Sequence, residues 1–218
     1  MIYLYILVAL VVAYLCGSIP NAVWIGKRFW GVDVREHGSK NAGTTNVLRV
    51  LGRKAALPVF ILDILKGFVA VSVMGLLPHF ASVSENTLIS LKIVAVFAAV
   101  VGHILPIFAG FKGGKGVATL VGSIAAVHPP LVLLCFAAWL LVLAISHYVS
   151  LSSMVAGCLF PIFTIALPAT RHITPLVIFS VVTAILLIVT HRKNIGRLLD
   201  GTESKIYLKR PKNTDGDN

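Results

Sequence analysis

Long apolar runs alternate with short polar segments along the whole chain. We expect helical membrane segments over seven of these runs, at about residues 2–25, 55–77, 88–108, 117–127, 131–146, 151–167 and 173–190. A helix needs about 20 residues to cross the hydrocarbon core, and most of the runs approach that length. The run 117–127 would give only about 17 Å of helix at ~1.5 Å per residue, so this segment is expected to be short. The pattern predicts an all-α, polytopic membrane helical bundle of about seven transmembrane segments.

The composition supports this fold class. Of the 218 residues, 57% are hydrophobic and 12% are charged, and no Asp, Glu, Lys or Arg occurs between Gly116 and Thr170. A water-exposed surface does not accommodate such a stretch. The first run lacks a basic flank and a clear cleavage site, so we interpret it as a retained span, bent near Gly17 and Pro20. We expect one membrane domain over residues 1–209 and a disordered tail over 210–218.

Basic residues gather in three segments. Residues 27–54, 110–116 and 190–218 hold 16 of the 19 Lys and Arg residues. The net charge of +11 is therefore explained by the positive-inside rule, and nucleic-acid binding is not indicated. Seven crossings place all three segments on one face, which predicts an external N-terminus and a cytoplasmic C-terminus. The three cysteines lie in apolar runs without metal-ligand spacing, so we expect neither a disulfide nor a metal site.

The second basic segment contains GFKGGKGVAT, residues 110–119. It departs from the P-loop pattern G-x-x-x-x-G-K-[ST], because it has one spacer fewer and no hydroxyl for magnesium. Glycine N–H groups, the start of the following helix and the side chains of Lys112 and Lys115 would still form a site for an anion such as phosphate. The alternative is a glycine-rich turn whose lysines only set the topology.

The first basic segment offers hydroxyl, amide and guanidinium groups that suit phosphate and hydroxyl oxygens. These groups belong to Ser39, Asn41, Thr44, Thr45, Asn46 and Arg49. Ser, Thr and Asn also cap helices, and capping is compatible with ligand contact.

Further polar residues lie at or inside the apolar runs. His191 and Asn194 are three residues apart, on one side of a helical extension at the membrane surface, where an interfacial histidine and a capping asparagine are the alternative. Asp63 and Lys66 have the same spacing inside a span, which predicts a structural pair lining the cavity. His103 either reaches the same site or occupies the interface.

Three sequence blocks carry a family resemblance. GSIP with GSKNAGTTNVLRVLG, then GHILPIFAGFKGGKGVAT, then HRKNIGRLLDGTESK occur in this order, separated by apolar runs. Together they resemble the bacterial acyl-phosphate:glycerol-3-phosphate acyltransferases, small integral-membrane enzymes that begin phospholipid synthesis. Lys40 and Thr44 depart from the Gly and Ala common in that family.

The resemblance implies transfer of a long-chain fatty acyl group from acyl phosphate to the 1-hydroxyl of glycerol 3-phosphate, in the bacterial inner membrane. The products are lysophosphatidate and inorganic phosphate. The implied partners are these two substrates and membrane lipid; we infer no cofactor and no obligate protein partner.

We assign site residues on this basis. Lys115, His191 and Asn194 are the expected catalytic residues, with either His191 or a substrate phosphate taking the hydroxyl proton. Ser39, Thr45 and Arg49 are expected to bind glycerol 3-phosphate. The expected acyl-phosphate ligands are Lys112, Gly113, Gly114, Lys115 and Gly116. The expected supporting residues are Asn41, Asn46, Asp63, Lys66 and His103.

Other functions fit the sequence less well. Acyl-CoA-dependent glycerophosphate acyltransferases use H-x-x-x-x-D, and no histidine here has Asp at that spacing. CDP-alcohol phosphotransferases need several metal-binding aspartates, whereas only Asp33 and Asp63 precede the C-terminal region. An anion or lipid-phosphate transporter would use a cationic glycine-rich site near the bilayer midplane, reached from both faces. Here the polar residues gather on one side, which favours the enzyme.

Overall fold

The computed structural model describes residues 2–206, so the tail expected over residues 210–218 lies outside the described part. Within residues 2–206 the regular elements are all helical, as the sequence predicts. In chain order they are α1 Ile2–Gly17, α2 Asn21–Trp30, α3 Thr44–Leu51, α4 Arg53–Met74, η1 Leu77–His79, α5 Glu85–Ile104, η2 Ile107–Ala109, α6 Val117–Val127, α7 Pro129–Ser146, α8 Val149–Ala166, α9 Thr174–Thr190 and α10 Arg192–Leu199.

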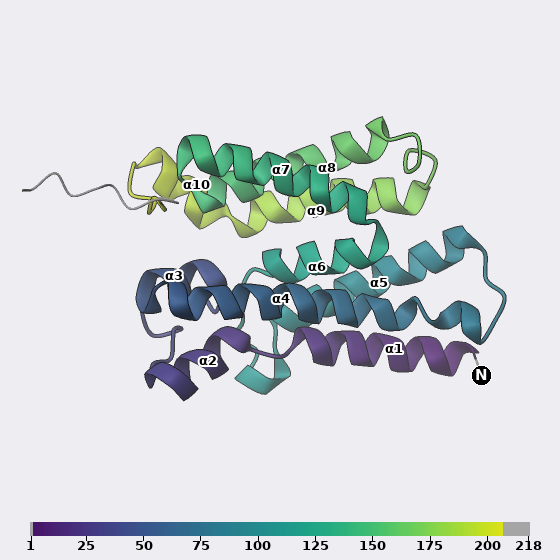
Figure 1. Ribbon diagram of the computed structural model, residues 1–218, viewed down its shortest axis with the longest axis horizontal. Coiled ribbons are helices and arrows are strands. Elements are labelled where there is room, and N and C mark those ends of the chain that lie inside the picture. Colours follow the sequence, from purple (N-terminus) through teal and green to yellow (C-terminus); the bar gives the residue numbers. More distant parts are fainter. Residues whose placement is uncertain (1, 207–218) are drawn as a thin grey trace, which may run out of the picture.

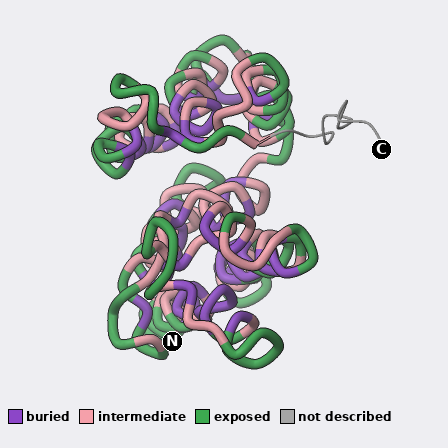
Figure 2. Tube along the Cα trace, turned by 90° about the vertical axis from the view of Figure 1, so that its left-hand side faces the viewer, coloured by how far each residue is buried: buried purple, intermediate pink, exposed green. Residues whose placement is uncertain are grey.

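The helices form two groups, which two perpendicular views both separate (Figures 1 and 2). α1 to α6 make up the first group, and α7 to α10 make up the second. The chain passes between them at a turn where Pro129 begins α7 and the side chain of His128 accepts a hydrogen bond from the N–H of Leu131. α9 of the second group also packs on α5, where the rings of Phe97 and Phe179 meet at 5.3 Å. The two groups are thus joined at particular places along their length.

Most of the helices suit a membrane. In the described part of the chain, five helical stretches are long and apolar enough to cross one, namely Ile2–Trp30, Arg53–His79, Glu85–Ala109, Pro129–Ser146 and Val149–Ala166. α9 and α10 add a sixth when taken as one span bent by 57°. α6, with 11 residues, is the short apolar segment that the sequence predicts. The predicted number of about seven is therefore reached only when α6 and the bent pair are both counted.

Outward-facing apolar side chains complete this picture. Tyr3 is 84% exposed and Ile145 is 74% exposed. In an integral membrane protein such side chains face lipid, and the backbone polar groups behind them are satisfied within the helices.

Glycines allow close packing inside the first group. A Cβ at Gly17 of α1 would lie 2.0 Å from the carbonyl oxygen of Ala99 in α5, and a Cβ at Gly122 of α6 would lie 1.9 Å from the carbonyl oxygen of Ile64 in α4. Small residues at these crossings let the helix backbones touch, which is the main source of packing energy between helices in lipid. The contact fixes α6, which begins at the glycine loop, against α4.

The first apolar run breaks at Pro20, as predicted, and α4 supports the break. Lys66 donates to the carbonyl oxygen of Ile19 at 2.7 Å, and Asn21 donates to Oδ1 of Asp63 at 2.9 Å. Lys66 and Asp63 also form the predicted ion pair, at 2.9 Å, with both side chains buried. This pairing and hydrogen bonding offset the high cost of two charges in an apolar setting.

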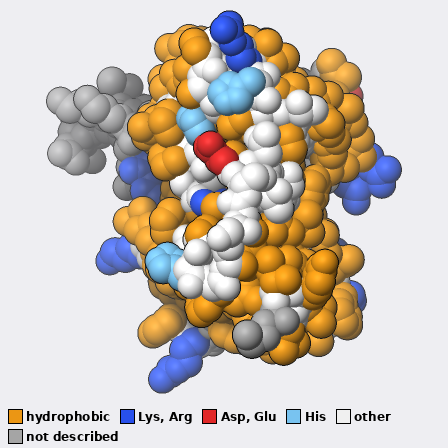
Figure 3. Space-filling view, turned by 90° about the vertical axis from the view of Figure 1, so that its right-hand side faces the viewer, with side chains coloured by type: hydrophobic (Ala, Val, Ile, Leu, Met, Phe, Trp, Pro, Cys, Tyr) orange, Lys and Arg blue, Asp and Glu red, His pale blue; other side chains and the backbone are white. Residues whose placement is uncertain are grey.

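The polar segments lie at one end of the molecule. Figure 1 places α2, α3 and α10 at its left-hand end, whereas α1 starts at the right-hand end. Figure 3 faces that right-hand end, where hydrophobic and uncharged atoms cover most of the surface, an acidic side chain lies near the centre and Lys or Arg side chains appear mainly around the outline. The three basic segments together hold 16 of the 19 Lys and Arg residues, and their described parts belong to the opposite end or to its loops.

Candidate functional site

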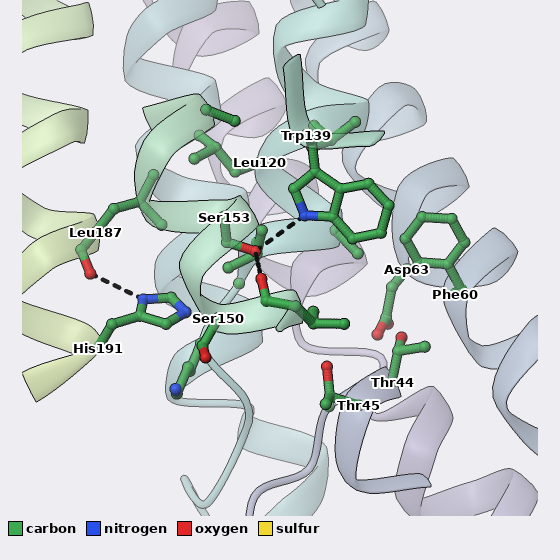
Figure 4. Close-up of a pocket in the computed structure, with 18 of the residues that line it drawn as sticks. Thr44, Thr45, Phe60, Asp63, Leu120, Trp139, Ser150, Ser153, Leu187 and His191 are labelled. Carbon is green, nitrogen blue, oxygen red and sulfur yellow. Dashed lines mark hydrogen bonds between the residues drawn. The ribbon is translucent and has the colours of Figure 1, made fainter. Parts of the chain in front are cut away.

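A cavity of about 880 Å³ lies between the two helix groups and reaches the charged end of the bundle. Residues from all three basic segments line its mouth, including Ser39, Lys40, Asn41, Thr44, Thr45, Asn46, Arg49, Arg53, Lys115, His191, Lys193, Asn194, Arg197 and Glu203. Further down, the lining is apolar and includes Leu57, Phe60, Leu120, Ile124, Leu131, Phe136, Trp139, Phe160 and Leu187. One cavity thus combines a cationic mouth with an apolar interior. Figure 4 shows part of its lining, with polar residues such as Thr45, Ser150 and His191 beside apolar ones such as Leu120 and Trp139.

The glycine loop is held against the end of α5. The N–H of Gly113 donates to the carbonyl oxygen of Ile104 at 3.1 Å, and the N–H of Gly114 donates to that of His103 at 3.2 Å. A Cβ at Gly114 would lie 2.3 Å from Nε2 of His103, so a side chain does not fit there. These glycines let the loop approach α5, and their N–H groups are already engaged.

This arrangement revises part of the predicted phosphate site. Gly113 and Gly114 line a separate small cavity of about 10 Å³, and Lys112 is exposed and does not line the large cavity. Lys115 and Gly116 do line it. α6 begins directly afterwards without a side-chain cap, so the N–H groups of its first turn are left without an intrahelical partner. The groups at this point that are available to an anion are the ammonium group of Lys115 and the N–H groups at the start of α6.

Lys115 lines the cavity and connects the two helix groups. Its ammonium group donates to Oδ1 of Asn194, across the junction between the two helix groups. Burial, together with the positive charges of Arg197 and Arg49, lowers the pKa of Lys115 to about 8, while the carboxylate of Glu203 opposes this shift. An anionic ligand beside the ammonium group would raise this pKa again.

Glu203 positions Asn194, and our assignment from sequence missed it. Its carboxylate accepts hydrogen bonds from Asn194 at 2.8 Å, Ser150 at 2.8 Å and Arg197 at 2.6 Å. Burial opposes ionisation of Glu203, but these hydrogen bonds outweigh it, so its pKa is lowered. Because the carboxylate takes the Asn194 NH₂ group, the amide oxygen is left to face Lys115. No spacing rule connects an acidic residue after α10 with a serine on α8.

The first basic segment is shaped by Asn46. Its amide donates to the carbonyl oxygens of Val34 at 2.7 Å and His37 at 3.1 Å, while its Oδ1 accepts the N–H of Ser39 at 2.8 Å. Asn46 is 1% exposed, and its hydrogen bonds hold the loop backbone, including the N–H of Ser39, in place. Supporting roles of this kind are what we expected of Asn46.

The histidine at the end of α9 has a defined orientation. Nδ1 of His191 lies 2.8 Å from the carbonyl oxygen of Leu187. A carbonyl accepts only, so the neutral ring carries its proton on Nδ1 and leaves Nε2 as an acceptor. Figure 4 shows this ring on the opposite side of the cavity from Thr44 and Thr45 of α3.

Asp63 and His103 lie where the mouth meets the interior. Both line the large cavity, whereas Lys66 lines only the small one. Nδ1 of His103 lies 3.0 Å from the hydroxyl of Thr119 and 3.9 Å from Oδ1 of Asp63. His103, which is 6% exposed, therefore belongs to the buried network that seats the glycine loop. Arg53 and Arg197 are further cationic lining residues that our assignment from sequence did not include.

This fold and site define an integral membrane protein that can hold anionic groups beside a hydrocarbon chain. The model of the glycerol-3-phosphate acyltransferase family matches residues 7–201, and the chain belongs to this family. It is 46% identical to a glycerol-3-phosphate acyltransferase of Clostridioides difficile, over 96% of this chain and 98% of that one. A relative of the same name in Fusobacterium nucleatum is 43% identical, over 90% and 95%.

The fold is shared with a solved relative. A crystal structure of PlsY (YgiH), an integral membrane glycerol 3-phosphate acyltransferase in its glycerol 3-phosphate form, superposes with a TM-score of 0.80. That chain is 38% identical, and the match covers 93% of this chain and 96% of the other. A lysophosphatidic acid form of PlsY gives a TM-score of 0.77 at 37% identity. The protein is thus an acyltransferase and a multi-pass membrane protein, and the transporter alternative is not supported.

Proposed function

We propose that the protein transfers a long-chain fatty acyl group from acyl phosphate to the 1-hydroxyl of sn-glycerol 3-phosphate, the first step of phospholipid synthesis. The products are lysophosphatidate and inorganic phosphate. The observation that carries this proposal is the single cavity with a cationic mouth and an apolar interior. Both substrates bring a phosphate, and the donor also brings a hydrocarbon tail.

The charges at the mouth match two phosphate groups. Among residues 2–206, six Lys or Arg side chains line the cavity, namely Lys40, Arg49, Arg53, Lys115, Lys193 and Arg197. The two acidic lining residues in the same range, Asp63 and Glu203, are paired with Lys66 and Arg197. The excess of positive charge attracts anionic substrates and stabilises their phosphates.

Each side chain has a role in this proposal. Lys115 and the start of α6 hold the phosphate of the donor, and Asn194 fixes the ammonium group. Ser39, Thr45 and Arg49 hold glycerol 3-phosphate, with Arg49 suited to bidentate contact with its phosphate. The tail of the donor extends into the apolar part of the cavity.

The chemical step needs no covalent enzyme intermediate, because an acyl phosphate is already an activated anhydride. The 1-hydroxyl oxygen attacks the acyl carbon, an ester bond forms, and the bond between that carbon and the phosphate oxygen breaks. The hydroxyl proton passes to Nε2 of His191 or to the departing phosphate, and Lys115 stabilises the charge on that phosphate. Positioning and charge stabilisation supply the acceleration.

The same proposal fixes the orientation in the membrane. The mouth and the C-terminus face the cytoplasm of the bacterial inner membrane, and the N-terminus lies outside, as the positive-inside rule predicts. Cysteine labelling of intact cells at an engineered N-terminal residue and at Ser204 would check this. Label at Ser204→Cys from outside would overturn it.

The decisive assay gives the purified protein glycerol 3-phosphate with either an acyl phosphate or the matching acyl-CoA. We expect lysophosphatidate and one equivalent of inorganic phosphate from the acyl phosphate alone. The variant Lys115→Ala is the matched control and should retain less than about one hundredth of the turnover. Transfer from acyl-CoA in place of acyl phosphate would refute the proposed donor.

A further inference from the structure

One wall of the apolar part of the cavity follows α8. On α8 the lining residues run from Val149 near the mouth to Phe160, which is about 17 Å along a helix that rises ~1.5 Å per residue. The lining positions on α8 change in size with depth. After Val149 come two serines, then Ala156 and Gly157, and then the ring of Phe160. On α8 the smallest lining residues therefore lie just before the bulkiest one.

Three buried side chains close the far end of this path. Ile124 of α6, Leu131 of α7 and Phe160 of α8 line the cavity and are 7%, 0% and 3% exposed. They belong to the hydrophobic core, where Phe160 meets Phe179 edge-on at 6.0 Å. Interiors packed in this way yield little to a ligand that is too long.

Gly157 lies in the last turn before this floor and lets Leu187 pack directly against α8. A Cβ at this position would lie 2.5 Å from Cδ1 of Leu187, another residue of the cavity wall. A side chain at Gly157 would therefore displace Leu187 within the cavity wall. Cys158, the next residue, is exposed and does not line the cavity.

We propose that the floor formed by Ile124, Leu131 and Phe160 sets the length of acyl chain that the enzyme prefers, and that Gly157, by letting Leu187 pack against α8, keeps the last part of the path open. This inference rests on the proposed function, because it takes the apolar path to be the place of the donor's tail. Methylenes that still find room gain packing contacts with the cavity wall. Methylenes beyond the floor gain nothing and displace the chain from the mouth.

The test measures kcat/KM for decanoyl, dodecanoyl, tetradecanoyl, hexadecanoyl and octadecanoyl phosphate with saturating glycerol 3-phosphate. The wild type is compared with Gly157→Val, Phe160→Ala and the control Cys158→Val. In Gly157→Val we expect the preference to move to shorter donors, with at least a tenfold fall for the longest relative to the shortest. In Phe160→Ala we expect it to move to longer donors. Cys158→Val should keep the wild-type profile, and KM for glycerol 3-phosphate should not change.

The shape of each profile decides the question, whatever the absolute rate. Profiles of Gly157→Val and Phe160→Ala with the wild-type shape would overturn the proposal. Leu131→Ala provides a second floor variant where Phe160→Ala does not fold, and Gly157→Val leaves the floor itself intact.

Failure of the proposed function has a different signature, because the wild type would then use no acyl phosphate of any length. In that case the test measures how much lysophosphatidates of the same five chain lengths raise the melting temperature of the wild type and of Gly157→Val. Their tails occupy the same path, so Gly157→Val must again shift the most stabilising length downward, and an unshifted series would refute the inference.

Discussion

The low pKa of Lys115 predicts how the activity depends on pH. In the free enzyme its pKa is lowered to about 8, chiefly by burial. Only the ammonium form holds a phosphate, and kcat/KM reports the free enzyme. With a pKa of about 8, about nine tenths of the molecules carry the charge at pH 7 and about one tenth at pH 9. We therefore expect kcat/KM to fall about tenfold for each pH unit above 8.

The sign of this effect follows from the direction of the shift. An ordinary lysine, with a pKa near 10.4, would keep its proton well past pH 9 and show no such fall. A bound phosphate favours the ammonium form, so kcat should decline only at higher pH than kcat/KM. Initial rates over pH 6.5–10, with the spontaneous hydrolysis of acyl phosphate subtracted, would give both profiles.

Lys115→Arg is the matched variant. Its guanidinium group stays charged throughout this range, so the descending limb near pH 8 should disappear even though the different geometry lowers the rate. If kcat/KM of Lys115→Arg still falls above about pH 8, the fall must come from the titration of another group. A flat wild-type profile up to pH 10 would contradict the environment that we describe for Lys115.

Three further predictions concern other parts of the site and the fold. Glu203→Gln should lower kcat by about tenfold or more, because Asn194 loses its charged hydrogen-bond acceptor. Unchanged kinetics would show that Glu203 is not needed to position the Asn194 amide. Gly122→Ala should destabilise the protein by about 1–3 kcal/mol, because the new Cβ meets Ile64, whereas Gly196→Ala, with open space around it, should melt like the wild type. Arg49→Lys should raise KM for glycerol 3-phosphate about tenfold or more through the loss of bidentate contact, and a rise confined to the acyl donor would contradict its assignment.

Much of the fold could be predicted because membrane helices leave a strong signal in the sequence. The lengths of the apolar runs predicted the helical segments, and Pro20 predicted the break in the first span. The length of α6 was also evident, since 11 apolar residues cannot span the hydrocarbon core. The sequence does not show how the second helix group packs on the first. Lipid-facing and buried positions are both apolar, so the sequence does not distinguish the packed faces of these helices.

The candidate site was predicted in outline. Charge and topology together placed three segments at one end, and the structure brings Arg49, Lys115 and His191 to one cavity. Two details needed coordinates. The glycine motif does not reveal that the N–H groups of Gly113 and Gly114 donate hydrogen bonds to carbonyl oxygens of α5. The sequence also does not reveal that Glu203 accepts a hydrogen bond from Ser150 of α8. Both depend on contacts between helix ends that are remote in sequence.

The bend at Pro20 has a consequence for the synthesis of the protein. Asn21 and Ile19 reach their partners on α4 across separations of 42 and 47 residues. The first span therefore leaves the ribosome before the residues that support its bend have been made. When α4 enters the membrane with Asp63 and Lys66, their partners are already present in the first span. These partners are the side-chain amide of Asn21 and the carbonyl oxygen of Ile19. Insertion of the nascent chain is thus complete only when these two spans have met.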